Sequence, residues 1–406
     1  MRIIRASCFI VICMLLSLSV AAQDNVSPLL DMLKLVPDNE QTHAGVPLVS
    51  YADYRAIEAA RGIDAPLTKA DFDNNTDKAS LWIAATSGVM SGMPLNYFVQ
   101  YLDGMQTAVG FSWFDVDRAL TFGQPPSTGN ILSLSGGFKA EVAVNTFEAR
   151  NYTIENRDDV RVLCGPSGCD KGLELNLENR NPSNPFGGEL GRDEPVALLP
   201  NNVIANSADY AVLSAILDAR QGKEPSLADN PAVQAAVNVI AGEGTLRQVQ
   251  FFNGADVGNY GDIVATDVPE SDQPDYLPTY SLAFFADTYN ADNQSAVVGL
   301  VYEDADSANI ATALLVDRLQ MAQSMVTNQP FMGMIEDRGG NIASAAVETD
   351  AATGKFIALL GIQYPMPPNE KQDGKFMASS LVFKLLIDSI YRRDAIWLAA
   401  DFTAPQ

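Results

Sequence analysis

Four oxygen-bearing side chains stand at alternate positions of one short segment: Asp71, Asp73, Asn75 and Asp77. This spacing is typical of a loop that wraps carboxylate and amide oxygens around Ca²⁺. The match is incomplete, because the sixth position is Thr76 rather than glycine and the twelfth is Trp82 rather than glutamate. The alternative is a polar segment in which Asp77 caps a helix that runs through Leu81. We favour this alternative and keep a calcium site at the four residues as a hypothesis.

Two cysteines are spaced for a disulfide. Cys164 and Cys169 enclose Gly-Pro-Ser-Gly, a tight loop that can bring two Cβ atoms together. Such a short loop implies a stabilisation of only about 2 kcal/mol. A redox pair would favour two intervening residues, and a metal site would need further ligands, which a chain with one histidine does not supply. The spacing therefore predicts a disulfide.

No group of residues predicts catalysis. His43 is the single histidine, so any Ser-His-Asp or Cys-His mechanism would depend on it, and no nucleophile-elbow spacing occurs near it. We expect an exposed loop histidine. Neighbouring acids such as Asp158 and Asp159 are expected by chance in an acidic chain, and a carboxylate hydrolase would require two acids that converge in one pocket. The glycine pairs lack the spacing of a phosphate loop, so no cofactor is predicted.

The first residues have the pattern of a secretory signal. Arg2 and Arg5 precede the apolar run 8–20, which is too short to span a bilayer, and Ala21-Ala22 completes a small-residue cleavage pattern. We expect residues 1–22 to be removed, the mature chain to be extracellular or periplasmic, and no membrane insertion after cleavage.

The charge of the chain limits its partners. Lys and Arg total 26 against 50 Asp and Glu, a formal net charge of −24. Such a surface repels phosphate backbones and anionic headgroups, so we expect no nucleic-acid binding. The partner is expected to be an unknown protein or small-molecule ligand.

The clearest structural pattern covers residues 196–240. Two short apolar runs flank Pro200-Asn201-Asn202 and predict a hairpin. Ser207 is placed to cap a following helix, with Asp209 in its first turn. Asn230 and Pro231 open a second helix with one apolar face.

The same succession returns later in the chain. Apolar runs at 280–286 and 296–302 predict another hairpin, followed by a helix over 307–326. Repeated hairpin-plus-helix units favour an α+β fold of antiparallel sheets with helices packed on one face. The acidic, aperiodic stretch 254–278 predicts a linker or long loop between an N-terminal domain at 23–253 and a C-terminal domain at 279–406, which are two similar domains if the units arose by duplication.

The hairpin leading into Ser207-Ala-Asp-Tyr-Ala-Val-Leu213, followed by Ser226-Leu-Ala-Asp-Asn-Pro231, resembles an uncharacterised domain family of exported bacterial proteins. The resemblance covers residues 130–240. It implies an exported bacterial protein without assigned activity, and it supplies no catalytic residues.

The sequence therefore favours an exported, non-enzymatic binding or interaction protein of the cell envelope or extracellular space. Two alternatives remain open. One is a carboxylate-dependent hydrolase, and the other is a structural module stabilised by Ca²⁺ at Asp71 to Asp77.

Overall fold

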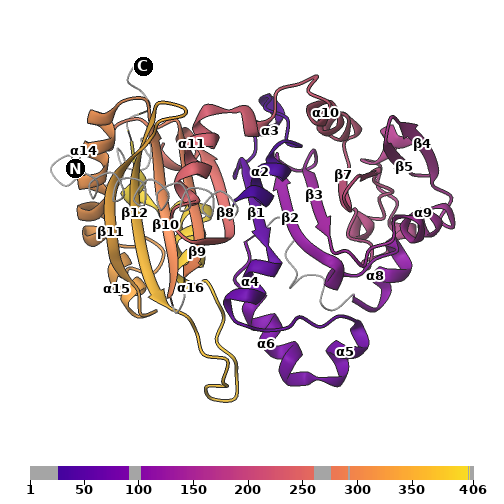
Figure 1. Cartoon of the computed structure of the whole chain (residues 1–406), viewed down its shortest axis with the longest axis horizontal. Coiled ribbons are helices and arrows are strands. Elements are labelled where there is room, and N and C mark those ends of the chain that lie inside the picture. The colour runs from indigo at the N-terminus through magenta and orange to yellow at the C-terminus, as the bar shows by residue number, and fades with distance from the viewer. Residues whose placement is uncertain (1–25, 91–101, 260–275, 291–292, 401, 403–406) are drawn as a thin grey trace, which may run out of the picture.

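The computed structural model describes residues 26–90, 102–259, 276–290, 293–400 and 402 (Figure 1). The predicted signal segment, most of the acidic stretch 254–278 and residues 291–292 lie outside these ranges. No helix in the ranges above has the length and apolar character needed to cross a membrane.

Twelve strands of the described chain form one antiparallel sheet, in the order β11-β12-β10-β9-β8-β1-β2-β3-β7-β6-β5-β4 (Figure 1). In chain order the strands are β1 (Val49–Asp53), β2 (Val116–Phe122), β3 (Gly129–Leu134), β4 (Thr153–Arg157), β5 (Val160–Cys164), β6 (Val196–Leu199), β7 (Val203–Ser207), β8 (Thr245–Asn253), β9 (Leu282–Asn290), β10 (Asn293–Tyr302), β11 (Asn341–Asp350) and β12 (Lys355–Pro365). The predicted α+β class with antiparallel pairing is confirmed.

Helices follow or precede these strands along the whole chain. In chain order they are α2 (Ser27–Leu33), α3 (Glu40–His43), α4 (Tyr54–Ala60), α5 (Lys69–Asn74), α6 (Thr76–Thr86), α8 (Leu102–Val109), α9 (Ala140–Glu148), α10 (Tyr210–Arg220), α11 (Pro231–Ile240), α12 (Gly254–Gly258), α14 (Ala305–Met321), α15 (Phe331–Glu336) and α16 (Leu381–Tyr391).

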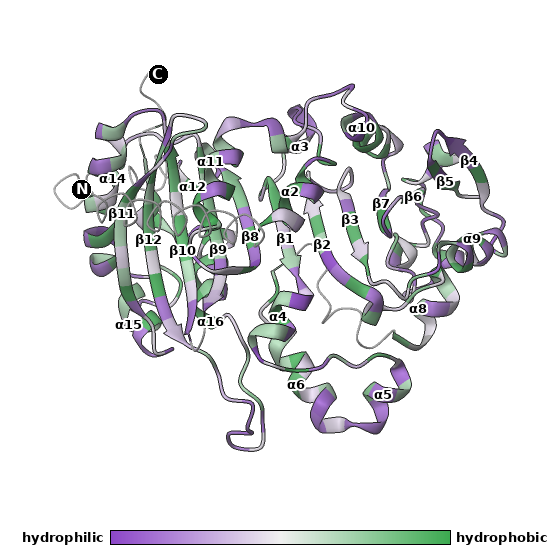
Figure 2. Ribbon diagram, viewed as in Figure 1, coloured by the Kyte–Doolittle hydropathy of each residue, from purple (hydrophilic) through white to green (hydrophobic). Residues whose placement is uncertain are grey.

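The prediction that helices pack on one face of the sheet is wrong, because both faces are covered. Alternate residues of a strand point to opposite faces: Leu120 of β2 joins a core with α2, α10 and α11, whereas its neighbour Ala119 joins a core with α4, α6, α8 and α9 on the other side. On that second side α14, α15 and α16 cover β9, β10 and β12. Central strands such as β10 and β12 are accordingly apolar along most of their length (Figure 2). The molecule is a three-layer structure with the sheet in the middle.

The sheet continues across the predicted domain boundary. β8, which ends at Asn253, pairs with β1 on one side and with β9 on the other, and Phe251 lies opposite Phe284. The segment 254–278 therefore connects two neighbouring strands of one sheet. The division into an N-terminal and a C-terminal domain stays a prediction.

The two halves of the sheet share one strand order. From the centre outwards, the N-terminal half runs β1, β2, β3, β7, β6, and the C-terminal half runs β8, β9, β10, β12, β11. In each half the chain forms a central strand, then one hairpin and later a second hairpin. The later strand of this second hairpin, β7 or β12, lies nearer the centre of the sheet than the earlier one. The N-terminal half differs by carrying the extra hairpin β5–β4 outside β6. This shared order is what a duplication would produce.

The two predicted hairpin-plus-helix units are present as β6–β7–α10 and β9–β10–α14. The cap of α10 differs from the prediction: Asp209, not Ser207, is the N-cap, because its carboxylate accepts the Ala211 N–H at 3.0 Å while Ser207 Oγ accepts the Asp209 N–H. α14 begins earlier than predicted, because the carboxylate of Asp304 accepts the Ser307 N–H. The cap of α11 at Asn230 is confirmed.

Candidate functional site

A cavity with a volume of about 660 Å³ lies on the sheet face covered by α2 and α10. Its lining combines apolar and polar side chains with three cations, Lys34, Arg118 and Arg220. The other lining residues are Ser27, Pro28, Asp31, Met32, Leu35, Ser133, Leu199, Pro200, Asn201 and Val203. A concave site of this size with a few polar groups on an apolar wall is typical of small-molecule binding sites.

Local structure fixes each wall of this pocket. α2 buries Leu29 and Leu33 against the sheet, which leaves its other side to form one wall. The turn between β6 and β7 forms the rim, and Asn201 and Asn202 adopt the left-handed conformation there, with φ of 61° and 58°. Asparagine is among the few residues other than glycine that tolerate this conformation, which explains why the chain turns here. The predicted turn is confirmed.

Arg118 of β2 is the cation on the pocket floor. Its Nε donates to Asp53 Oδ2 at 2.6 Å, while Asp53 Oδ1 caps α4 by accepting the Ala56 N–H. Partial burial lowers the pKa of Arg118, but the charge of Asp53 and the nearby Tyr51 raise it by more, so the pKa lies above its usual value. The hydroxyl of the buried Tyr51 is a second hydrogen-bonding neighbour of the Arg118 guanidinium. Arg118 thus keeps its charge and is held in place by Asp53 and Tyr51.

The two other cations stand at the pocket mouth. Lys34 Nζ pairs with Asp31 at 2.9 Å, and both side chains are largely exposed. Arg220 at the end of α10 binds Asp159 through both Nη atoms, at 2.7 and 2.5 Å. Solvent-exposed pairs such as Lys34–Asp31 contribute little to stability.

The lining therefore has three cations and one acid, Asp31, in a chain with a net charge of −24. Each of these cations has a carboxylate partner, so the site is close to neutral, and an anion meets less repulsion here than on the rest of the acidic surface. The planar guanidinium of arginine is the side chain best suited to bind a carboxylate or a phosphate. The sequence did not indicate this site, since its cations are 84 or more positions apart along the chain: Lys34, Arg118 and Arg220.

The predicted calcium residues occupy two consecutive helices rather than a loop. Three of them bind lysines: Asp71 pairs with Lys78 at 2.8 Å, Asp73 with Lys69, and Asp77 with Lys371. The fourth, Asn75, is the N-cap of α6 and accepts the Lys78 N–H. The helix through Leu81 is present, but its cap is Asn75 instead of Asp77, which lies in the first turn. Calcium binding at these residues stays a prediction, which a melting curve with and without Ca²⁺ would test.

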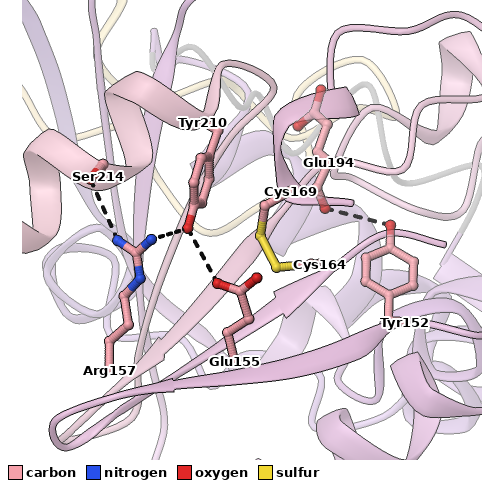
Figure 3. Close-up of a disulfide and its surroundings, with 8 residues drawn as sticks. All are labelled: Tyr152, Glu155, Arg157, Cys164, Cys169, Glu194, Tyr210 and Ser214. Carbon is pink, nitrogen blue, oxygen red and sulfur yellow. Dashed lines mark hydrogen bonds between the residues drawn. A yellow bond between two sulfur atoms is a disulfide. The ribbon is translucent and has the colours of Figure 1, made fainter. Parts of the chain in front are cut away.

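Cys164 and Cys169 form the predicted disulfide, at the end of β5 (Figure 3). Glu155 of β4 lies beside them, and its carboxylate oxygen and the two sulfurs are within 4.8 Å of one another. This is the one group of three potential metal ligands in the described residues. Because metals bind thiolates and these sulfurs are bonded to each other, the group does not form a metal site in this state.

The expectation of an exposed loop histidine is wrong. His43 ends α3, and its ring lies between Asp38 Oδ1 at 2.5 Å and Asn253 Oδ1 at 3.0 Å. Asn253 donates its Nδ2 to the His43 carbonyl and to Asp256, which fixes its Oδ1 as an acceptor. Both ring nitrogens therefore face acceptors, an arrangement that favours the doubly protonated imidazolium. Partial burial lowers the pKa of His43, but these partners raise it by more, and the net pKa is raised.

This network predicts a pH dependence of stability. A raised pKa in the folded state means that the stabilisation by His43 is fully present below the unfolded pKa of about 6.5 and is lost as the pH rises through the folded pKa. We expect urea unfolding of the wild type to lose stability over this range by more than unfolding of His43→Gln does. Glu194, whose pKa burial raises to about 7, contributes a background common to both proteins. Parallel pH profiles for the two proteins would contradict the prediction.

A buried ionic cluster between the sheet and residues 366–380 was not predicted. Arg247 of β8 and Asp287 of β9 form an ion pair, and both side chains have 0% exposure. Arg247 also donates to Gln294 at 2.6 Å, while Asp287 Oδ2 accepts from Gln248 at 3.0 Å and from Ser380 at 2.6 Å. Charged residues are almost never fully buried unless they are paired. The sequence did not predict this pair, because hydrophobic periodicity does not show which arginine binds which acid.

The carboxylate hydrolase hypothesis requires two acids in one pocket. Burial raises the pKa of Glu194 to about 7 and also raises the pKa of Glu58. They belong to separate networks, because Glu194 accepts from Asn206 and Glu58 accepts from Trp82. The pocket of about 660 Å³ is lined by neither. The hydrolase hypothesis stays a prediction and gains no support from this pocket.

No protein-family model matches this chain, and no curated protein matches it. Among solved structures, crystal form III of TP0453 aligns over 81% of this chain and 92% of that chain, with 9% sequence identity and a TM-score of 0.28. A TM-score this low carries no argument about fold or function. Membership of the uncharacterised exported family stays a prediction.

Proposed function

We propose that this chain is an exported, non-enzymatic binding protein whose pocket between α2, β2, β3 and the β6–β7 turn takes a small organic anion. The ligand's carboxylate or phosphate faces Arg118, and its apolar part lies against Met32, Leu35 and Val203. This keeps the sequence-based expectation of an exported binding protein and adds a ligand class to it.

The observation that carries the proposal is the state of Arg118. Asp53 holds it through Nε, and the Tyr51 hydroxyl lies against its guanidinium, so its orientation is fixed before a ligand arrives. Its side chain is 27% exposed at the cavity, where a hydrogen bond to an anion is screened less than at the open surface. Preorganised donors of this kind reduce the entropy cost of binding.

Export is supported by two further features. The segment 1–22 has the pattern of a signal peptide, and the disulfide between Cys164 and Cys169 suits an oxidising compartment.

The test is a thermal-shift panel on the chain expressed from Gln23, in which each anion has a neutral analogue of similar shape. Benzoate is compared with benzamide, and phenyl phosphate with phenol. A ligand that binds the native state at about a hundred times its dissociation constant adds about 2.7 kcal/mol of stability. We expect at least one anion to raise the melting temperature while its neutral analogue does not. Equal shifts within every pair would contradict the assignment of the pocket to an anion.

A further inference from the structure

The outer edge of β4 is closed to other strands. β4 has five residues, and its Glu155 and Arg157 side chains both reach the Tyr210 hydroxyl of α10 (Figure 3). Charged side chains and a short length are common means by which proteins keep an edge strand from pairing with another chain.

β11, at the opposite edge (Figure 1), lacks these protections. It has ten residues, most of them exposed, and the first charged one is Glu348. In the described chain it pairs with β12 alone. Its Ile342 and Val347 pack against the core that contains α14. Two weak side-chain hydrogen bonds reach its carbonyls, Thr312 Oγ1 to Ala346 O and Asn341 Nδ2 to Ile342 O, both at 3.4 Å. A bulge between Ile342 and Ser344 interrupts the strand near its start and leaves the remainder regular. A long edge strand whose first seven residues, 341–347, carry no charge is a ready template for strand pairing.

The other half of the sheet shows what this position accepts. β6 occupies the place in the N-terminal half that β11 occupies in the C-terminal half. β6 is not an edge, because β5 pairs antiparallel with it, with Leu163 opposite Val196 and Val162 opposite Ala197. The position thus carries an antiparallel strand in one half and is open in the other.

We propose that β11 pairs antiparallel with β11 of a second copy of this chain, which joins two 12-stranded sheets across a twofold axis near Ala345 and Ala346. An antiparallel pair of identical strands is closed and self-complementary, so it ends at a dimer. This inference is independent of the anion pocket.

Side chains and charge allow this approach. Ser344, Ala345 and Ala346 are small, so two edges can reach the usual strand spacing of about 4.8 Å. With the axis at Ala345 or Ala346, the two Glu348 side chains lie roughly four to six residues apart, which is about 14–20 Å. This exceeds the Debye length of about 8 Å at physiological ionic strength. The net charge of −24 on each copy still opposes association, so added salt should strengthen the dimer.

The first experiment is sedimentation velocity of the chain expressed from Gln23, from low micromolar to submillimolar concentration, in low and in high NaCl. We expect a monomer–dimer equilibrium with a smaller dissociation constant in high salt. Ala345→Lys should raise the dissociation constant about fivefold or more, because it places like charges across the axis. Thr153→Lys on β4 makes the same change in net charge at the other edge and should leave the dissociation constant unchanged.

The second experiment locates the axis. Opposed residues of antiparallel strands have Cα atoms about 4.5–5.5 Å apart, within the range of a disulfide. Ala345→Cys or Ala346→Cys should therefore give a covalent dimer under mild oxidation, whereas Thr153→Cys should not. A wild type that stays monomeric at submillimolar concentration in high salt would overturn the proposal. So would an Ala345→Lys variant that dimerises as the wild type does.

Discussion

Asp287→Asn should destabilise the protein by about 3–5 kcal/mol, the cost of removing one partner of a buried ion pair. The substitution leaves the Arg247 guanidinium, which is fully buried, without a counter-charge. It also turns one acceptor oxygen into an N–H₂ group at a place where Gln248 and Ser380 both donate to Oδ2. Urea unfolding followed by circular dichroism measures the change in the free energy of unfolding.

A matched control separates burial from pairing. Asp159→Asn breaks the pair with Arg220, which has two hydrogen bonds but an exposed carboxylate. Solvent screens such a pair, so we expect a much smaller change. The double variant Arg247→Met with Asp287→Leu removes both charges and should recover stability relative to Asp287→Asn. Equal stability of Asp287→Asn and the wild type would show that the buried pair is not formed.

Arg118→Gln should weaken the binding of the best anion from the ligand panel about tenfold to a hundredfold. The change removes a charged donor whose hydrogen bonds to an anion contribute about 1.5–3 kcal/mol. Glutamine leaves Asp53 in place as the cap of α4, since that contact uses Oδ1 and the Ala56 N–H. Isothermal titration calorimetry on both proteins measures the ratio of dissociation constants.

Arg161→Gln is the control for this variant. Arg161 is also a strand arginine with one carboxylate partner, Glu141 at 2.7 Å, and its side chain is 30% exposed against 27% for Arg118. It does not line the pocket. If both variants bind the anion with the same affinity as the wild type, Arg118 does not contact the ligand.

Local chemistry in the sequence predicted the elements that depend on neighbours along the chain. The turn at Asn201 and Asn202 depends on two residues that tolerate positive φ, and the α11 cap depends on Asn230 and Pro231. The disulfide between the two cysteines also follows from short spacing. These features need no partner from far away, and each was confirmed.

The sequence failed where a local rule allowed two outcomes. Ser207 and Asp209 both suit an N-cap, and the choice of Asp209 follows from where β7 ends and α10 begins. The four residues from Asp71 to Asp77 fit a calcium loop in spacing, but two helices place three of them beside lysines.

By itself the sequence determined an acidic α+β protein with antiparallel hairpins, a disulfide and the pattern of an exported chain. Only the tertiary structure decided that one sheet spans both halves, that helices cover both faces, and that Lys34, Arg118 and Arg220 line one pocket. The physical reason is the range of the interactions. Turns, caps and a short disulfide loop are set within a few residues, whereas strand order and convergent charges depend on pairings between distant segments whose hydrophobic patterns are interchangeable.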